Sequence, residues 1–382
     1  MVGLVIRVAR HRRFTANHTF HLDVGARRLF VKANPNPAEA AAEIAGYRRI
    51  QHHYPLPALH AYHRVGRWTL TVYDRHRPDQ PDTGLLLDAI TAGDVGARAN
   101  LDHGLDAILN RYQHVIGTTM RHLPASQTIG KLYRDRARPG GRIDLYYGHN
   151  PNLLTMPDRS AIRCSDLHET TLVINGQPRR LDFDALVTGL RTALHPDQQT
   201  WAATTQGDPT DVNIGLDDQN RPVWFDYDTA GLNSLAGEIA CFLWYQRLHA
   251  AWLVPRYNPG AFADHRRAII DAVRPQVRLA RLSARTIAID YQHRPSAARQ
   301  HTVARYLGQL ARPLATSIGT DLLTWLRPYL AMRLLAVYPL HQMEPSDAAL
   351  SIGLLADLYA PEADLAHLLG LTTTPGRTAH ES

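Results

Sequence analysis

The signals for secondary structure change in character near Leu85, and this change limits the possible folds of the 382-residue chain more than any other feature. Before it, short apolar runs alternate with turn residues, which is typical of strands. After it, apolar residues recur mostly at helical spacing. A chain that moves from strands to helices in this way is expected to form an α+β fold with two lobes, a small mixed β-sheet lobe and a large, mainly helical one.

Individual elements are predicted with the same rules. In the small lobe we expect strands at Arg13–Leu22, Ala26–Ala33, Leu59–His63 and Trp68–Tyr73, and a helix at Ala38–Ile50. In the large lobe we expect a hairpin over Thr170–Phe183, a helix at Asp184–Leu194 and a strand at Trp201–Thr205. Beyond Gly231 we expect almost only helices, with amphipathic ones at Phe262–Leu282 and Asp321–Leu335 and an apolar one at Asp347–Tyr359.

The length of the chain also favours two lobes, because 382 residues exceed what one simple core usually holds. We place a small lobe at residues 1–78 and a large helical lobe at residues 79–371. Within the second lobe, residues from about 121 to 183 are predicted to be an insertion. The polar residues 372–382 are predicted to be a flexible tail.

Composition excludes several classes of protein. The net charge is +7, but the basic residues are scattered, so a nucleic-acid partner is not expected and a strongly cationic substrate is slightly disfavoured. No apolar run is long enough for a membrane span or a signal peptide, and a cytoplasmic protein is expected. The two cysteines show no disulfide or metal spacing, and Cys241 is predicted to be a core residue. The 21 histidines show no zinc-protease spacing either.

The first candidate site residue is Lys32, one of only two lysines in the chain, at the end of the run Phe30–Lys32. A lysine at a strand end can bind the phosphates of a nucleotide, and Glu43 in the following helix can hold its ammonium group. Taken alone, a solvated lysine on an edge strand explains Lys32 better.

The second candidate is the loop Asp208-Pro209-Thr210-Asp211-Val212-Asn213. Phosphoryl transfer to a hydroxyl needs a carboxylate that accepts the proton of the alcohol and, nearby, an oxygen ligand for a metal ion. Asp208 and Asn213 supply this pair of side chains. A plain surface turn uses the same residue types, so the loop alone is weak support.

The third candidate is the apolar run Val223–Phe225 with Asp226 at its end, eighteen residues after Asp208. A hairpin turn at Leu216–Arg221 is expected to bring Asn213 and Asp226 to one side of a shared site. Mg²⁺ prefers such hard oxygen ligands, together with phosphate oxygens. Asn213 and Asp226 are therefore the predicted metal ligands.

In their order along the chain, these motifs resemble the aminoglycoside phosphotransferase and choline kinase family within the protein-kinase-like superfamily. The resemblance covers residues 12–75 and 200–245 and implies a two-lobed kinase-like fold with ATP or GTP as phosphoryl donor. It also implies that residues 1–78 are the nucleotide-binding lobe and residues 79–371 the catalytic, substrate-binding lobe. The segment Thr15–Phe20, which contains Asn17 and Thr19, resembles the loop that covers the nucleotide. The segment Trp68–Asp74 resembles the strand that leads into the hinge between the lobes. There, backbone groups near Val72, Tyr73 and Asp74 would meet the adenine. Lys32 and Glu43 match the ion pair of the family, and Asp226–Gly231 matches its metal-binding run.

The sequence departs from the pattern of the family at three places. Gln206 stands where a histidine usually precedes Gly-Asp, and since that histidine is mainly structural, the packing of the loop is affected more than activity. Arg12-Arg13-Phe14 replaces the common glycines of the nucleotide loop, and Glu238 replaces a more usual aspartate.

The resulting prediction is a magnesium-dependent kinase that phosphorylates a hydroxyl of a small molecule, with Asp208 as the catalytic residue. The acceptor is left open among an antibiotic (in resistance or biosynthesis), a sugar, a nucleoside, an amino alcohol and an amino acid, as is the oligomeric state. A group of tyrosines and arginines in the middle of the chain has two possible roles: recognition of a polar or anionic substrate, or simply part of a solvated insertion. These residues are Tyr133, Arg134, Arg136, Arg138, Arg142, Tyr146 and Tyr147. The alternative function is a non-catalytic nucleotide-binding or scaffold protein with the same fold.

Overall fold

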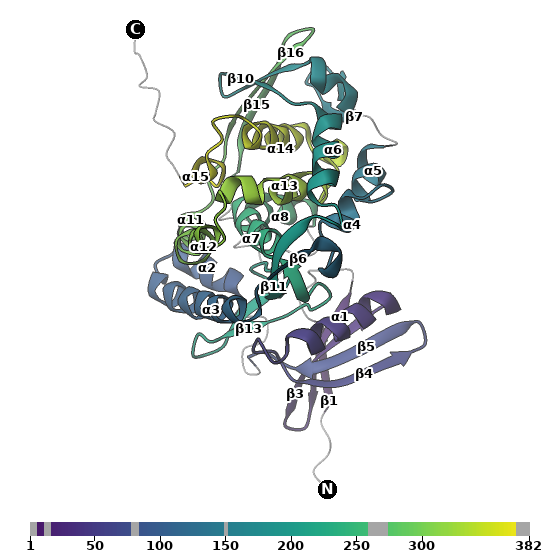
Figure 1. The fold of residues 1–382 in the computed structure, drawn as a ribbon. Coiled ribbons are helices and arrows are strands. Elements are labelled where there is room, and N and C mark those ends of the chain that lie inside the picture. Colours follow the sequence, from purple (N-terminus) through teal and green to yellow (C-terminus); the bar gives the residue numbers. More distant parts are fainter. Residues whose placement is uncertain (1–5, 11–16, 78–83, 149–151, 259–273, 372–382) are drawn as a thin grey trace.

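The computed structural model describes residues 6–10, 17–77, 84–148, 152–258 and 274–371. Its N-terminal part is a five-stranded antiparallel sheet in the order β1-β2-β3-β5-β4, with helix α1 between β3 and β4 in the chain (Figure 1). The elements are β1 (Ile6–Arg10), β2 (His18–Val24), β3 (Arg27–Asn34), α1 (Pro37–Ile50), β4 (Leu59–Val65) and β5 (Trp68–Asp74).

Helix α1 begins where the sequence supplies a cap. The Asn36 side chain accepts hydrogen bonds from the amides of Ala38 and Glu39, and Pro37 occupies the first helical position. Gly46 lies on the inner face, where a Cβ atom would come within 1.7 Å of the Tyr227 carbonyl oxygen. Only glycine permits this close approach, so Gly46 sets how α1 packs against the segment that carries Asp226.

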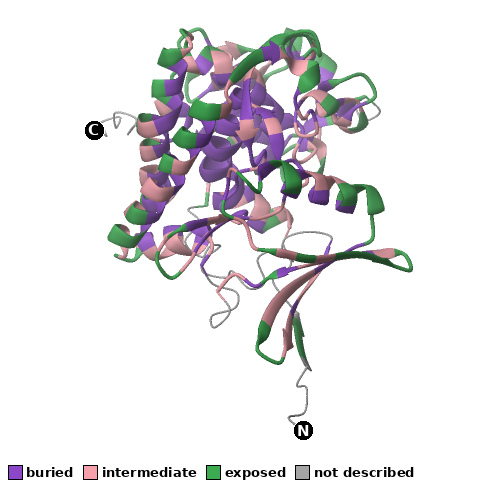
Figure 2. Ribbon diagram, turned by 60° about the horizontal axis from the view of Figure 1, so that its bottom comes forward, coloured by how far each residue is buried: buried purple, intermediate pink, exposed green. Residues whose placement is uncertain are grey.

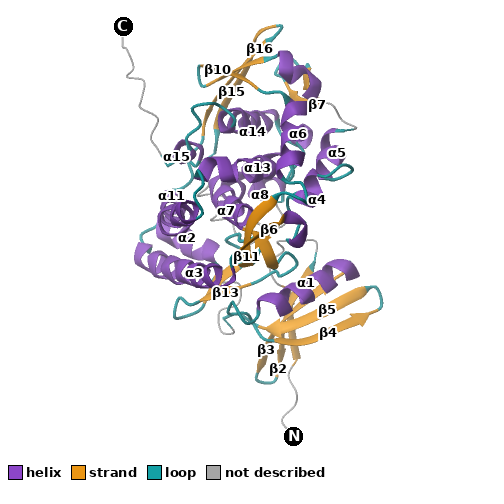
Figure 3. Ribbon diagram, viewed as in Figure 1, coloured by secondary structure: helices purple, strands orange, loops and turns teal. Residues whose placement is uncertain are grey.

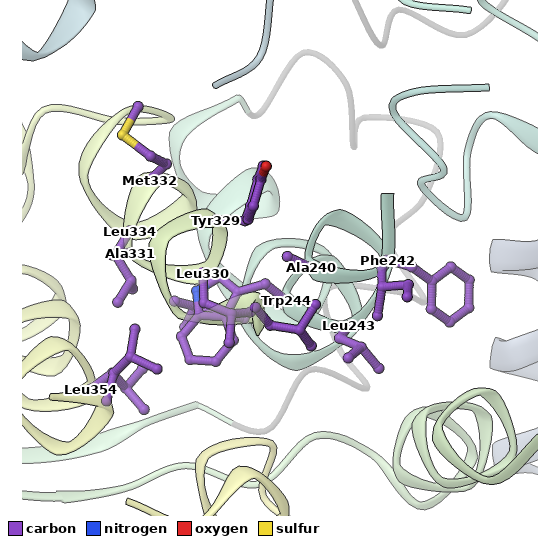
Figure 4. Packing of buried hydrophobic residues seen from close by; sticks show 14 of the residues in the cluster. Ala240, Phe242, Leu243, Trp244, Tyr329, Leu330, Ala331, Met332, Leu334 and Leu354 are labelled. Atoms are coloured by element: carbon purple, nitrogen blue, oxygen red, sulfur yellow. The ribbon is translucent and has the colours of Figure 1, made fainter. Parts of the chain in front are cut away.

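The remainder of the chain is mainly helical and contains the largest part of the core (Figures 2 and 3). Helix α7 (Leu235–Trp244) is buried along its whole length, and α13 (Leu322–Leu335) packs against it. Figure 4 shows Trp244 of α7 near Leu330 of α13, and Leu354 of α14 (Pro345–Leu358) belongs to the same buried cluster. Each buried leucine stabilises the fold by about 1.5–3 kcal/mol relative to an exposed one.

The other helical segments surround this core. They are α2 (Leu86–Asp94), α3 (Arg98–Thr119), η1 (Ala125–Gln127), α4 (Arg134–Ala137), α5 (Arg142–Tyr147), η2 (Cys164–Glu169), α6 (Phe183–Ala193), η3 (Tyr245–Leu253), α8 (Val254–Tyr257), α11 (Ala297–Tyr306), η4 (Leu307–Ala311), α12 (Arg312–Ser317), η5 (Leu340–Gln342) and α15 (Leu365–Leu368). Segments η3 and η4 are π-helical, a rare conformation that is frequent near functional sites.

Four small sheets complete the helical part. One has the order β14-β11-β6, and the hairpins β12-β13 and β7-β8 are separate. The fourth has the order β10-β9-β16-β15, with β16 parallel to β9, and it contacts α14. The strands are β6 (Arg121–Pro124), β7 (Asn152–Thr155), β8 (Ala161–Arg163), β9 (Thr171–Ile174), β10 (Gln177–Arg180), β11 (Gln199–Thr205), β12 (Ile214–Leu216), β13 (Pro222–Trp224), β14 (Gly231–Ser234), β15 (Gln276–Ser283) and β16 (Thr286–Gln292).

The predicted α+β fold is confirmed, and most predicted elements of the small lobe are present. The helix predicted at Phe262–Leu282 is wrong from Gln276 onward, because these residues form β15, and residues 259–273 lie outside the described part. The expectation of almost only helices beyond Gly231 also needs correction, since β14, β15 and β16 lie there. The strand predicted from Arg13 begins at His18, and residues 11–16 are not described.

The segment predicted to be an insertion begins with β6, which pairs with β11 next to the candidate catalytic loop. The predicted tail, residues 372–382, lies outside the described residues. In the part of the chain that the structure describes, every helix is too short or too polar to cross a membrane.

Candidate active site

Lys32 lies at the centre of a buried group of charges where the sheet meets the helical part. Its Nζ atom is 2.8 Å from Glu43 Oε2 on α1 and 2.7 Å from Asp226 Oδ1 after β13. Burial disfavours the charged form of Lys32, but the two carboxylates outweigh burial and raise its pKa above the usual value. The pKa of Asp226 is lowered, because the attraction of Lys32 outweighs the effect of burial. The ammonium group is therefore charged and held in a defined position.

Tyr73 and Asp74 at the end of β5 differ in their surroundings. Tyr73 is buried, and its hydroxyl donates to Glu43 Oε1 at 3.0 Å, a contact that the sequence did not predict. Asp74 is exposed and lies 2.6 Å from His60, while its amide donates to the Ala58 carbonyl. The contact of adenine with backbone groups near Tyr73 and Asp74 stays a prediction.

Asn17 and Thr19 lie at the start of β2. Thr19 is directly opposite Lys32 in the pairing of β2 with β3, and Asn17 is buried beside it in the chain. Thr19 is therefore close to the lysine that we expect to bind phosphate, and Asn17 directly precedes the strand that carries Thr19. The remainder of the predicted nucleotide loop, including Arg12-Arg13-Phe14, lies outside the described residues.

Asp208 lies in the loop between β11 and β12. Its Oδ1 atom accepts a hydrogen bond from the Cys241 thiol at 3.0 Å and is 3.6 Å from Nη1 of Arg333. The Asp208 side chain is 32% exposed, so a substrate can reach this carboxylate from solvent. Gly207 precedes it with φ of +90°, and a Cβ atom there would be 2.2 Å from the Thr229 carbonyl oxygen. The glycine is thus required for the turn that presents Asp208.

Asp211 anchors the middle of this loop. Its side chain is buried and 2.8 Å from Nη1 of Arg299 on α11, and its carbonyl accepts from the Leu87 amide. A buried carboxylate that is paired in this way holds the backbone of the loop in place. Asp211 is therefore a structural residue of the loop.

The β12-β13 hairpin brings Asn213 and Asp226 to the same end, as the sequence predicted. The Phe225 amide donates to the Asn213 carbonyl at 2.9 Å. Asn213 Nδ2 donates to the Asp208 carbonyl at 2.9 Å, which leaves its Oδ1 atom available as a ligand. Asp226 has φ of +54°, a strained conformation that is common at functional sites.

These side chains fit a Mg²⁺ ion bound jointly with a nucleotide. Among the described residues, no three histidine, cysteine or acidic side chains gather as a metal site on their own. Mg²⁺ commonly needs only one or two protein oxygens, because phosphate oxygens and waters complete its octahedral shell. The Asn213 amide oxygen and the Asp226 carboxylate would supply those two.

Gln206 connects the catalytic loop to the Asp226 segment. Its Nε2 atom donates to the carbonyls of Phe225 and Asp226 at 3.0 and 2.8 Å, and its Oε1 atom accepts from the Asp208 amide at 2.7 Å. The side chain is fully buried. Gln206 therefore fixes the position of Asp208 relative to Asp226 without contacting either carboxylate.

We expect Gln206→Ala to lower the free energy of unfolding by about 1–3 kcal/mol, because buried polar groups lose their partners. We also expect a lower kcat with a smaller change in the KM for nucleotide. Urea unfolding and steady-state kinetics measure both effects. Gln219→Ala, in the exposed turn of the hairpin, is the matched control. Wild-type stability and kcat in Gln206→Ala would show that these hydrogen bonds do not position the loop.

Glu238 on α7 holds the start of the loop that carries Asp208 through hydrogen bonds. The sequence did not predict this role. Its carboxylate accepts from the Thr205 hydroxyl at 2.7 Å, the Gly207 amide at 2.9 Å and the Tyr112 hydroxyl at 3.0 Å. Burial raises the pKa of Glu238 to about 7 despite these donors. Only its place shortly after Asp226 in the sequence could have indicated it.

No role was predicted for Lys131, the second lysine of the chain, although the rarity of lysine in this sequence pointed to a specific one. It forms an ion pair with Asp228, two residues after Asp226. Burial and the neighbouring charge of Asp226 raise the pKa of Asp228 to about 6. Both lysines of this protein thus neutralise carboxylates of the Asp226–Asp228 segment.

Solved structures show which known fold this arrangement shares. The aminoglycoside phosphotransferase APH(4)-Ia is similar with a TM-score of 0.51 at 12% sequence identity, over 93% of this chain and 94% of that one. A thermostable mutant of that enzyme, in a ternary complex with AMP-PNP and hygromycin B, gives a TM-score of 0.52 at 12% identity, over 93% and 95% of the two chains. Compared by sequence, the chain matches no family model and no curated protein.

Proposed function

We propose that this chain, which has the fold of the aminoglycoside phosphotransferases, is a kinase that transfers the γ-phosphoryl group of ATP or GTP to a hydroxyl of a small molecule. The observation that carries the proposal is the buried Lys32 between Glu43 and Asp226, linked through Gln206 to Asp208. Phosphoryl transfer needs these parts: a cation for the donor phosphates, oxygen ligands for a metal and a carboxylate for the acceptor.

Each side chain has a separate task in this proposal. Lys32, held by Glu43, binds the nucleotide phosphates as a point charge. Asn213 and Asp226 hold Mg²⁺, which neutralises the phosphate charge when it is bound. Because Lys32 already contacts Asp226 Oδ1, the lysine and this carboxylate are close enough to act on the same phosphate group.

Asp208 aligns the acceptor hydroxyl and accepts its proton. Its Oδ1 atom is occupied by Cys241 and lies near Arg333, which leaves Oδ2 for the acceptor. Rate enhancement comes from alignment and from charge stabilisation, with direct transfer from donor to acceptor. The two structural neighbours support a site for a nucleotide and a small molecule, since one of them holds AMP-PNP and hygromycin B.

A transfer screen of the purified protein tests the proposal. The protein is incubated with Mg²⁺, with ATP or GTP, and with a mixed library of antibiotics, sugars, nucleosides, amino alcohols and amino acids, and products are detected by the mass of an added phosphoryl group. We expect at least one phosphorylated product, whose formation requires Mg²⁺. Thermal shifts with ATP and GTP, with and without Mg²⁺, identify the donor. A protein that binds nucleotide with Mg²⁺ but phosphorylates no hydroxyl would instead be a nucleotide-binding scaffold.

A further inference from the structure

Three guanidinium groups converge at the C-terminal end of α13, next to Asp208. Arg136 of α4 and Arg142 of α5 each donate from Nη1 to the Ala336 carbonyl at 3.1 Å. Arg333 lies one turn earlier on α13, with its Nη1 atom 3.6 Å from Asp208 Oδ1. Residues that are far apart in the chain thus gather three positive charges at the acceptor side of the catalytic carboxylate.

Within the described ranges of the chain, these three charges have a single carboxylate nearby, that of Asp208. Among the described residues, no carboxylate lies within 4.0 Å of the guanidinium of Arg136 or Arg142, and Arg333 has only Asp208 at 3.6 Å. Arg333 is 5% exposed, and its Nε atom has no hydrogen-bond partner. The end of a helix carries about half a negative charge, which cannot balance three cations. Burying unpaired charges is costly, so an anion from outside is the natural complement.

The neighbouring groups do not supply that anion. His249, on the π-helical segment η3, is buried, and burial together with the charge of Arg333 lowers its pKa to about 3, so it is neutral. Tyr133 is kept protonated by a pKa far above the usual value, mainly because of its burial. For Arg136, burial and then repulsion by Arg142 and Arg333 lower the pKa to about 10. The guanidinium of Arg136 is therefore close enough to those of Arg142 and Arg333 to be repelled by both.

A small molecule can reach this cluster. Arg136 and Arg142 are only half-buried, as are Tyr146 and Tyr338 beside them. The guanidinium of Arg142 lies over the ring of Tyr146, 5.9 Å from its centroid, which orients it. Guanidinium groups bind carboxylates and phosphates with paired hydrogen bonds. The cluster is thus both accessible and suited to an oxyanion.

We propose that the acceptor is a small hydroxylated anion, with a carboxylate or phosphate group that Arg136, Arg142 and Arg333 bind while its hydroxyl faces Asp208. This inference rests on the proposed kinase function and specifies its substrate class. It disfavours polycationic acceptors, because such compounds need carboxylates where this protein has arginines. If the arginines only cap the C-terminal end of α13, the charge of the acceptor has no influence on how fast it is phosphorylated.

Matched acceptors test the inference. Phosphoryl transfer is measured for glycerol against glycerate and glycerol 3-phosphate, for glucose against gluconate and glucose 6-phosphate, and for hygromycin B as a cation. We expect turnover of anionic members and little or none of their neutral or cationic partners. Comparison of the carboxylate and phosphate members identifies the anionic group. Preference for the neutral or cationic members would overturn the inference and leave the kinase function intact.

Arginine variants connect the preference to the cluster. In Arg136→Gln and Arg142→Gln we expect the KM for the anionic acceptor to rise about 10- to 100-fold, as the loss of a charged hydrogen bond predicts, with little change in the KM for nucleotide. Arg138→Gln, an exposed arginine of the same segment, is the matched control and should resemble wild type. Unchanged acceptor KM in both folded variants would contradict the inference.

A binding measurement makes the inference independent of turnover. The thermal stability of the wild-type protein with Mg²⁺ and AMP-PNP is compared with and without each acceptor of the panel. Stabilisation by the anions alone supports the inference even if no phosphoryl transfer occurs, in which case only the kinase function fails. If no anionic member of the panel stabilises the protein, the inference is overturned. This result does not depend on whether an arginine variant folds.

Discussion

Replacement of Asp208 by asparagine is expected to lower kcat by a factor of about 100 to 10,000, the usual contribution of a positioned acid or base. In the proposed site, the carboxylate of Asp208 accepts the proton of the acceptor. An amide of the same shape retains the hydrogen bond from Cys241 but cannot take the proton. The KM for nucleotide should change little, because Lys32, Asn213 and Asp226 are untouched. Steady-state kinetics with any acceptor from the transfer screen measures the effect.

Asp218→Asn is the matched control for this variant. Asp218 is an exposed aspartate in the turn of the β12-β13 hairpin, so its replacement makes the same change in net charge near the site. We expect wild-type kinetics for it. Circular dichroism shows whether Asp208→Asn is folded. A folded Asp208→Asn protein with kcat within twofold of wild type would remove Asp208 from the catalytic machinery.

Replacement of Asp226 by asparagine is expected to lower kcat about 100- to 1,000-fold, the scale of losing one preorganised electrostatic partner. The variant loses a proposed metal ligand, so the Mg²⁺ concentration that gives half-maximal activity should rise. It also loses the ion pair that holds Lys32 from one side, while Glu43 at 2.8 Å keeps the other side in place. Kinetics as a function of Mg²⁺ concentration measures the effect.

Stability distinguishes the two roles of Asp226. Removal of the partly exposed Asp226 carboxylate leaves the buried Lys32 with one partner fewer, which is destabilising, so the free energy of unfolding should fall in Asp226→Asn and change less in Asp208→Asn. Urea unfolding of both variants and of Asp218→Asn makes this comparison. Unchanged activity and unchanged Mg²⁺ dependence in folded Asp226→Asn would contradict the proposed metal site, whatever its stability.

Local patterns predicted most elements correctly where neighbouring residues decide the conformation. The Asn175-Gly176 turn joins β9 and β10, with positive φ at both residues. The helix predicted at Asp321–Leu335 corresponds to α13, which Asp321 caps by accepting from the Thr324 amide. In both cases the signal and the structure that it specifies lie within a few residues of each other.

The largest error lies at β15. Polar and apolar residues alternate only over Gln276–Leu279, and the segment Gln276–Ser283 follows a stretch with helical spacing, so local spacing predicts a longer helix. What makes it a strand is its antiparallel pairing with β16, whose other edge is parallel to β9, more than a hundred residues earlier in the chain. Pairing between such distant segments leaves little trace in local spacing.

The sequence by itself determined which chemical groups the protein has and in what order: a rare lysine after a strand, Asp208 and Asn213 in one loop, and Asp226 after a hairpin. Only the tertiary structure decided what these groups meet. Lys32 contacts Asp226 across 194 positions of the chain, and Arg333 reaches Asp208 from a helix near the C-terminus. Turns, caps and hairpins depend on sterics and hydrogen bonds between near neighbours. Contacts between distant side chains depend on how the apolar faces of α1, α7 and α13 pack, and spacing in the sequence does not encode that packing.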